Sequence, residues 1–517
     1  MTSQKPPFRF TGRSIAAVSA LAIACIAFSS MAAQARPVVV RGAPFSPAYA
    51  DAITAAHAKL LQISTDPFHN AAAQHKTEVE SDNFSFGNTM VATFQVGRFP
   101  DSNAGSTDIG WSTTSDGGKT WMHGYLPGIT TLSPLAAPQY QRVTDPAIAY
   151  DAKHGVWMIV SLPYGTFRSV TTYLVPIVSR SSDGLTWQNP VHVAPDNGDF
   201  MDKPWIACDD ATMSKFYGHC YVEYIDVNLG EVLMMSTSTD GGVTWSTPSR
   251  SADSAGGNGG QPIVQPNGTV LVPFLGFSGI ETVNSKDGGK TWQASVLVAS
   301  ANEQPMPGGL RDPGPLPSAD VDAGGNAYVA WADCSFRSGC LENDVVFSSS
   351  SDGTHWSAPS RVPTSSRSST QTDWMPGFGI DHATAGSSAH VGVTYYYVSN
   401  AGCNSSTTCK VYAGYISSTN GGTTWNHPLQ LAGPMQPAWM PQSDLGHMLG
   451  DYLSTSFVNG LGRSSIPIAL APKNGKFRQA TYTTAMGLPP LRDRIQLSTF
   501  GERPVARLPR RPIPVME

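Results

Sequence analysis

Charged residues make up only 14% of this 517-residue chain, and the common signatures of nucleotide and metal enzymes do not occur in it. There is no Walker loop, no dinucleotide glycine motif after a βα unit and no HExxH pair. A formal net charge of −5 argues against nucleic acid as the main partner. Glycine (50) and proline (40) are abundant instead, which is typical of a chain with many short strands and turns.

Residues 1–35 are predicted to be a secretion signal peptide. A basic region precedes the apolar run from Ser14 to Phe28, and Ala33-Gln-Ala35 is a small-residue cleavage site. The apolar run is short for a membrane span, which disfavours a permanent anchor, and the residues around Cys25 fit a lipoprotein poorly. We therefore expect cleavage after Ala35 and a secreted or periplasmic protein without stable membrane insertion. The basic residues are Lys5, Arg9 and Arg13.

Six cysteines follow the predicted signal, and they fall into three local pairs. Short, even spacing in an exported chain predicts disulfides that pin loops or hairpins. Zinc is the alternative ligand, but no pair has CxxC spacing or histidines at ligand spacing. The predicted disulfides are Cys208 with Cys220, Cys334 with Cys340, and Cys403 with Cys409.

A glycine-rich turn that ends in tryptophan occurs six times, first as Thr114-Ser-Asp-Gly-Gly-Lys-Thr-Trp121. A short carboxylate or amide accepts hydrogen bonds from nearby backbone N–H groups and closes a tight turn, and the glycines supply positive φ. Because this position recurs in every copy, we interpret its Asp as structural, not catalytic. The other copies begin at Ser181, Ser238, Ser285, Ser350 and Ser418, and the last has Asn420 in place of Asp.

The pattern Ser-x-Asp-x-Gly-x-Thr-Trp resembles the Asp-box, or bacterial neuraminidase repeat, of sialidases and other Asp-box β-propellers. The resemblance covers most of residues 75–490 and implies an all-β propeller of four-stranded antiparallel blades. It also implies that the boxes lie between the third and fourth strands of each blade, away from the active site. The motif is specific for the fold and poor evidence for the activity.

A second repeat, a pair of strands, precedes each box, and a seventh pair beginning at Asp451 has no box after it. We therefore expect seven blades, with six, as in sialidase catalytic domains, as the alternative. The last blade should be completed partly by a strand from the other end of the chain, which removes exposed sheet edges. The predicted parts are the signal (1–35), a lead-in (36–74) with a short helix around Tyr49–Gln62, the propeller (75–500) and a Pro/Arg-rich tail (501–517).

Polar residues gather where the innermost strands should begin, at the mouth of the propeller channel. Carboxylates interleaved with Arg and Lys suit an acidic sugar, because Arg holds a carboxylate with two parallel hydrogen bonds. Paired carboxylates could act as acid and base in glycoside cleavage, although Asp before Pro also starts turns. The substrate-binding candidates are Glu78, Arg98, Arg142, Asp202, Lys203, Arg311, Asp312, Asp373 and Asp451. The catalytic candidates are Asp101, Asp108, Asp145 and Tyr452.

The sialidase resemblance implies a role for Arg98 with Asp101 or Asp108, which lie between a strand and the first box as the family's binding Arg and general acid do. The chain departs from the family in lacking its Phe/Tyr-Arg-Ile-Pro motif. It also has no clear match for the family's Tyr–Glu nucleophile pair, for which Tyr452 with Glu223 or Glu281 is the candidate.

We expect an exported carbohydrate-active enzyme, a sialidase-like glycoside hydrolase that acts on an acidic glycan. One alternative is a polysaccharide lyase on the same scaffold, with a His or Tyr base acting on a uronic acid. A non-catalytic glycan- or protein-binding propeller is the other, because a fold does not decide among functions. No cofactor is expected, although the clustered carboxylates could bind calcium.

Overall fold

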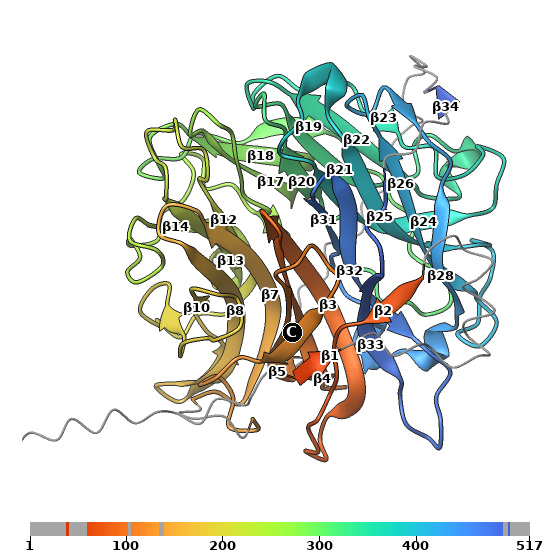
Figure 1. The fold of residues 1–517 in the computed structure, drawn as a ribbon, viewed down its shortest axis with the longest axis horizontal. Helices are drawn as coiled ribbons and strands as arrows, with labels where there is room; N and C mark the ends of the chain where they lie inside the picture. Colours follow the sequence, from red (N-terminus) through yellow and green to blue (C-terminus); the bar gives the residue numbers. More distant parts are fainter. Residues whose placement is uncertain (1–37, 41–58, 102–104, 134–138, 490–494, 497–517) are drawn as a thin grey trace, which may run out of the picture. The chain divides into compact units, whose positions relative to one another are not determined.

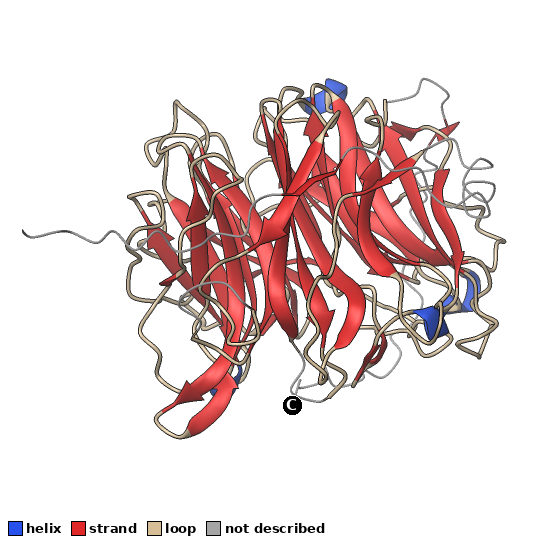
Figure 2. Ribbon diagram, turned by 60° about the horizontal axis from the view of Figure 1, so that its bottom comes forward, coloured by secondary structure: helices blue, strands red, loops and turns tan. Residues whose placement is uncertain are grey.

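The computed structural model describes residues 38–40, 59–101, 105–133, 139–489 and 495–496. The predicted signal peptide and the Pro/Arg-rich tail lie outside these residues. Strands dominate the described chain, and its helical parts are short 3₁₀ turns (Figure 2). Nowhere in the described ranges is there a helix long and apolar enough to cross a membrane. The 3₁₀ turns are η1 (Val227–Leu229), η2 (Ser338–Cys340), η3 (Gly386–Ser388) and η4 (Pro437–Trp439).

The described strands form seven successive antiparallel groups, numbered here in chain order. Group one contains β3 (Gln74–Phe86), β4 (Thr89–Arg98), β5 (Ser106–Thr114) and β6 (Trp121–Tyr125), with β1 (Val38–Val40) at its edge. Group two contains β7 (Arg142–Asp151), β8 (Val156–Phe167), β9 (Val170–Tyr173), β10 (Ile177–Ser181) and β11 (Val191–His192). Group three contains β12 (Met201–Cys208), β13 (Cys220–Asp226) and β14 (Val232–Ser238).

The later groups repeat the same up-and-down order. Group four contains β15 (Gly257–Asn258), β16 (Ile263–Val264), β17 (Val270–Gly276), β18 (Gly279–Ser285) and β19 (Val296–Ala299). Group five contains β20 (Ser318–Val321), β21 (Ala327–Asp333), β22 (Asp344–Ser350) and β23 (Ser360–Arg361). Group six contains β24 (Thr372–Ile380), β25 (Val391–Val398), β26 (Val411–Ser418) and β28 (Leu429–Met435). Group seven contains β31 (Ser454–Val458), β32 (Leu461–Ala469), β33 (Gln479–Thr484) and β2 (Leu60–Gln62). Two short pairs remain, β27 (Thr424–Trp425) with β34 (Ile495–Gln496), and β29 (Gln442–Ser443) with β30 (Gly446–His447).

The first strands of successive groups adjoin one another, and the last of them, β31, lies beside β3 (Figure 1). A backbone bridge joins Ser81 to Leu453, and the Ser81 hydroxyl bonds that of Ser465 at 2.6 Å. A series of antiparallel sheets that returns to its beginning has no open end, which is the arrangement of a β-propeller. The all-β propeller class predicted from the motif is therefore confirmed.

The last group is completed by β2, a strand from the other end of the chain. Leu60 pairs with Thr484, and Leu60 and Ile63 are buried. This confirms the predicted closure, but the predicted helix is wrong at Leu60–Gln62, because pairing with the open edge of β33 outweighs local helix propensity. The rest of the predicted helix, from Tyr49 on, falls outside the described residues.

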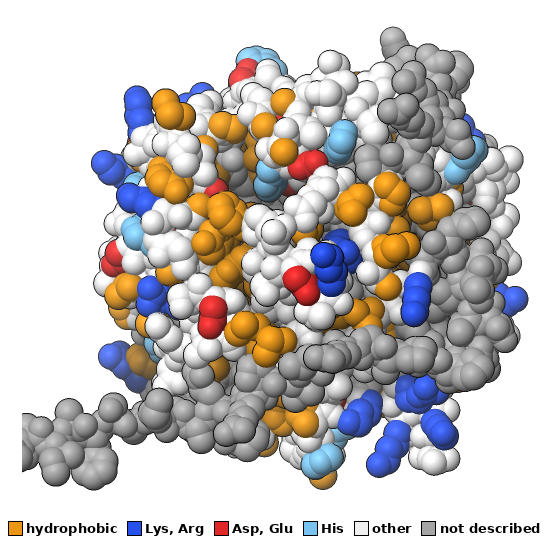
Figure 3. Space-filling model, in the orientation of Figure 1, with side chains coloured by type: hydrophobic (Ala, Val, Ile, Leu, Met, Phe, Trp, Pro, Cys, Tyr) orange, Lys and Arg blue, Asp and Glu red, His pale blue; other side chains and the backbone are white. Residues whose placement is uncertain are grey.

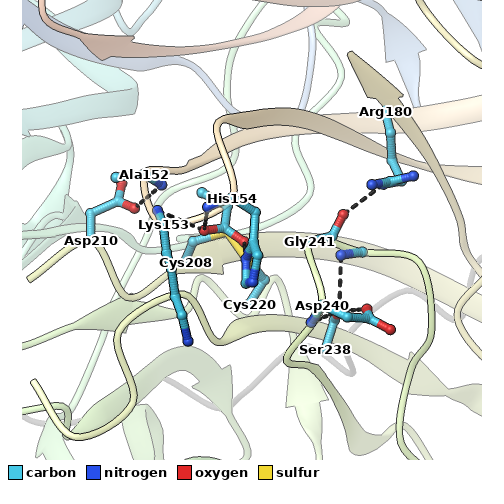
Figure 4. Close-up of a disulfide and its surroundings, with 12 residues drawn as sticks. Ala152, Lys153, His154, Arg180, Cys208, Asp210, Cys220, Ser238, Asp240 and Gly241 are labelled. Atoms are coloured by element: carbon cyan, nitrogen blue, oxygen red, sulfur yellow. Dashed lines mark hydrogen bonds and ion pairs between the residues drawn. A yellow bond between two sulfur atoms is a disulfide. The ribbon is translucent and has the colours of Figure 1, made fainter. Parts of the chain in front are cut away.

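The six motif turns follow β5, β10, β14, β18, β22 and β26, and each has the predicted hydrogen bonds. In the first copy Asp116 accepts the N–H groups of Lys119 and Thr120 at 3.0 and 2.9 Å, and Gly117 has a φ of 74°. Figure 4 shows the third copy, where Arg180 of the neighbouring group donates to the carbonyl of Gly241 at 2.6 Å. The tryptophans that end four copies are at most 3% exposed, namely Trp121, Trp187, Trp292 and Trp425.

The three predicted disulfides are all present. Cys208–Cys220 joins the end of β12 to the start of β13, close to the third motif copy (Figure 4). Cys334–Cys340 and Cys403–Cys409 lie in the loops that follow β21 and β25. Antiparallel pairing places those two loops at the end of the sheets where β20 and β24 begin.

Candidate functional site

Four of the inner strands are interrupted at the same place by a bulge. The register against the second strand shifts after Val79 in β3, Thr144 in β7, Asp202 in β12 and Trp374 in β24. Each bulge contains one residue with a strained, positive φ. These residues are Glu80 (49°), Asp145 (48°), Lys203 (50°) and Met375 (50°). Bulges change the direction in which side chains point, and they are over-represented next to active sites.

Asp451 is the centre of a buried ionic cluster. Arg311 donates to both of its oxygens, from Nε to Oδ1 at 2.6 Å and from Nη2 to Oδ2 at 2.7 Å. Lys203 also donates to Oδ2, and its Nζ lies 3.9 Å from Oε1 of Glu80. Burial alone would raise the pKa of Asp451, but the charges of Arg311 and Lys203 hold that pKa well below its usual range.

Beside this cluster Asp145 and Asp202 place two carboxyl groups at the bulges of β7 and β12. Both residues are buried, and the hydroxyl of Thr144 donates to Asp145 at 3.0 Å. Burial raises the pKa of Asp202 to about 7, Lys203 lowers it, and Asp145 raises it again. Burial and the negative charge of Asp145 therefore favour the protonated form of Asp202.

Arg98 is a buried cation on the other side of the pair. Only 2% of the residue is exposed, its Nη1 donates to the carbonyl of Gly105 at 3.0 Å, and its Nε has no partner. Arg98 makes no ion pair within the part of the chain that the structure describes. Burial raises the pKa of Tyr173, and the charges that act on it next are those of Arg98, Asp145, Asp202 and Arg142. Tyr173 thus connects the cations to the carboxyl pair.

A small pocket opens beside the pair. The rings of Trp205 and Tyr452 meet edge to face in it, with centroids 4.9 Å apart. The Tyr452 hydroxyl donates to the carbonyl of Pro146 at 2.9 Å, and burial raises the pKa of this phenol far above its usual value. Tyr452 is therefore a neutral phenol at neutral pH. The pocket is lined by Lys203, Pro204, Trp205, Gly259, Gly260, Gln261, Leu316, Pro317 and Tyr452.

Three further candidates have their described contacts at or near the rim of this region. Arg142 donates to Asp101 through Nη2 at 2.8 Å and stacks over Phe99 at 3.9 Å. The side chain of Asp101 is 48% exposed. Asp108 is buried, accepts from Ile109 N–H at 2.9 Å, and has its pKa raised to about 7 by burial.

The other three candidates have their described hydrogen bonds with loops or, for Glu78, also with strand β33. Glu78 accepts hydrogen bonds from Ser64 and Thr481, and burial raises its pKa to about 8. Asp312 accepts the N–H groups of Met306 and Gly314. Asp373 accepts from Thr364 and Gln371, and burial raises its pKa to about 7.

The structure thus brings together seven of the thirteen predicted site residues, and the roles of all thirteen stay predictions. The seven are Arg98, Asp145, Asp202, Lys203, Arg311, Asp451 and Tyr452. Glu80, Tyr173 and Trp205 join them, and of these Tyr173 and Trp205 were not selected from the sequence. A signal for the bulges exists, because proline follows the strained residue at Asp145-Pro, Lys203-Pro and Met375-Pro.

The surface in Figure 3 has few acidic side chains, whereas the acids of the site are buried. No group of three or more His, Cys, Asp or Glu side chains is arranged to hold a metal ion within the described ranges.

No protein-family model matches the chain, and no curated protein matches it. Among solved structures, the chain is similar to a protein of unknown function from Dyadobacter fermentans DSM 18053, with a TM-score of 0.42 and 15% identity over 70% of this chain and 99% of that one. The Trypanosoma rangeli sialidase in complex with sialic acid has a TM-score of 0.40 and 13% identity, over 83% and 59%. An ulvan lyase, a polysaccharide lyase, has a TM-score of 0.45 and 10% identity, over 85% and 98%. These TM-scores are below 0.5, so the similarities carry no argument about activity.

Proposed function

We propose that this chain is an exported carbohydrate-active enzyme, a sialidase-like glycoside hydrolase that acts on an acidic glycan. The observation that carries the proposal is the pair of buried carboxyl groups at the bulges, Asp145 and Asp202, where burial and the charge of Asp145 raise the pKa of Asp202 to about 7. Glycoside hydrolysis uses carboxyl groups in different protonation states, one to give a proton and one to attack or to activate water. We assign the attacking or water-activating role to Asp145, and we assign to Asp202 the role of passing the proton on.

Arg98 supports an acidic substrate. A buried guanidinium without an ion pair is costly, and an incoming carboxylate or sulfate would supply the missing charge. The charges of Arg98 and Asp145 both act on the pKa of Tyr173, so the proposed anion site and the proposed base belong to the same region. The Lys203–Asp451–Arg311 cluster is internally paired, and we assign it the role of holding the bulges in place.

We infer that the seven strand groups are the seven blades of one propeller. Three disulfides agree with folding in an oxidising compartment, as export would require.

A polysaccharide lyase is the second candidate, and Tyr173 favours it. Its phenol lies under the influence of Arg98 and Arg142, the kind of cations that would neutralise a uronate carboxylate while a tyrosine moves the proton.

The test uses the purified chain with fluorogenic glycosides of several acidic sugars and with acidic polysaccharides. Release of the fluorophore, abolished in Asp145→Asn and retained in the motif variant Asp287→Asn, supports the hydrolase. A rise in absorbance from an unsaturated uronate, lost in Tyr173→Phe, would replace it with the lyase. Binding of acidic glycans without either reaction would leave a binding propeller.

A further inference from the structure

Glu223 is a buried acid that the proposed reaction has not yet used. It lies in the middle of β13, its residue is 0% exposed, and neither Oε1 nor Oε2 has a hydrogen-bond partner. Burial, followed by the charge of Asp202, raises the pKa of Glu223 well above its usual value. A buried carboxyl group without a partner among the described residues favours its protonated form, so Glu223 can supply a proton.

The pairing of the strands places this acid beside the pocket. The Cα of Glu223 is opposite that of Trp205 in β12, so both side chains leave the same face of the sheet. Trp205 lines the pocket directly. On the other neighbouring strand, β14, the residue opposite Glu223 is the apolar Met235. Among the described charged groups, Asp202 raises the pKa of Glu223, and Asp202 is one of the two carboxyl groups proposed for the reaction.

Gly260 separates the carboxyl group from the open pocket. A Cβ at position 260 would lie 2.5 Å from Oε2 and 2.7 Å from Oε1 of Glu223, so any side chain there would displace the acid. Gly259 has a φ of 64°, which favours glycine, but Gly260 has no positive φ. The backbone thus does not require glycine at 260, whereas the carboxyl group of Glu223 does. Both glycines line the pocket, so the wall in front of the acid carries no side chain.

We propose that Glu223 is the proton donor of the site, covered in this structure by Gly260 and reached when the Gly259–Gly260 segment moves aside. This inference rests on the proposed hydrolase. The proton of Glu223 passes to the glycosidic oxygen as the bond from that oxygen to the anomeric carbon breaks, and the bonding electron pair stays on the oxygen. Water attacks the anomeric carbon and gives its proton to the Asp145–Asp202 pair. The pair then returns one proton through Asp202 to the Glu223 carboxylate, which restores the starting state.

The test compares two leaving groups, because an activated aryl oxygen leaves without protonation and a sugar hydroxyl does not. Glu223→Gln should lower kcat on a natural acidic disaccharide about 100-fold or more, and lower kcat on the activated aryl glycoside less than about 5-fold. The matched control is Glu342→Gln in the loop between η2 and β22, outside the residues assigned to the site, and both of its rates should match the wild type. Equal losses on both substrates, or no loss on either, would overturn the assignment.

A second measurement does not depend on activity. The infrared difference spectrum between wild type and Glu223→Gln at neutral pH should show the band of a protonated carboxyl group in the wild type. An ionised carboxylate band in its place would overturn the proposal even if no substrate were cleaved. If the wild type cleaves neither substrate, the hydrolase fails, and this spectrum alone decides whether Glu223 carries the proton.

Discussion

Arg311 donates two parallel hydrogen bonds of 2.6 and 2.7 Å to Asp451, and only 2% of each residue is exposed. The two residues are far apart in the sequence, and Lys203 from a third strand group binds the same carboxylate. The two buried cations therefore share Asp451 as their closest anion, ahead of Glu80 and Asp444. Removing one partner of such a cluster leaves uncompensated charge in a place that water does not reach.

Asp451→Asn should accordingly lower the free energy of unfolding by about 3–5 kcal/mol, because it leaves Lys203 and Arg311 without their anion. Denaturation in urea measures the change. The control is Asp444→Asn, because the side chain of Asp444 is 29% exposed and its Oδ1 lies 3.5 Å from Arg311 Nη1, farther than the oxygens of Asp451. Its loss should stay below about 1 kcal/mol. Similar losses in the two variants would contradict a special role for Asp451.

Stability should fall as the pH rises towards neutrality. Burial raises the pKa values of Asp82, Asp202 and Asp373 to about 7 and of Glu78 to about 8. Between about pH 4 and pH 7 the unfolded chain has lost these protons while the folded chain keeps them, so the unfolded state binds fewer protons and the free energy of unfolding decreases with pH.

Thermal unfolding should therefore give a higher Tm near about pH 5 than near about pH 8. Asp202→Asn removes one of the titrating groups, so its Tm should vary less steeply with pH than that of the wild type. A Tm that rises steadily through the same window would mean that these carboxyl groups ionise normally in the folded protein.

The carboxylates of the motif turns have the opposite effect on the pH dependence of stability. Hydrogen bonds from Thr120, Thr114 and Lys119 outweigh partial burial and lower the pKa of Asp116 to about 2. The stabilisation that such a group gives is present above its unfolded pKa and is lost as the pH falls towards 2.

The sixth motif copy shows which part of the turn is essential. Asn420 accepts the N–H of Thr424 through Oδ1 at 2.8 Å and donates to its hydroxyl through Nδ2 at 2.9 Å. In the fourth copy Asp287 accepts from both the N–H and the hydroxyl of Thr291. Asp287→Asn should hence be nearly neutral, whereas Asp287→Ala should cost about 1–2 kcal/mol through lost hydrogen bonds. Chemical denaturation of the two variants checks this, and an equal cost would show that the charge matters more than the acceptor.

Local chemistry in the sequence was enough to predict the turns and the disulfides, whereas the closing strand β2 lies where a helix was predicted. Asp116 and Gly117 depend on their immediate neighbours, and Cys334 and Cys340 are close in the chain. The site was only partly predictable, because its geometry comes from bulges. Asp145 and Lys203 face the cluster at positive φ, but Asp312 and Asp373 begin similar segments and their described contacts are with nearby loops. A bulge forms where the first strand changes register against the second strand of its group. The sequence of the first strand alone does not determine where this change occurs.

The closing strand offers the sharpest test of how the two ends of the chain hold the fold together. Leu60 is 1% exposed and packs with Tyr482, Ile466 and Ile468 in the core of the last group. Leu60→Ala removes buried carbon from a strand that has one partner, β33, and should cost about 2–5 kcal/mol. The matched control is Leu297→Ala in β19, where the side chain is 52% exposed and the cost should be within about 0.5 kcal/mol. Urea denaturation measures both. If Leu60→Ala behaved like the surface control, the β2–β33 pairing would not be what closes the propeller.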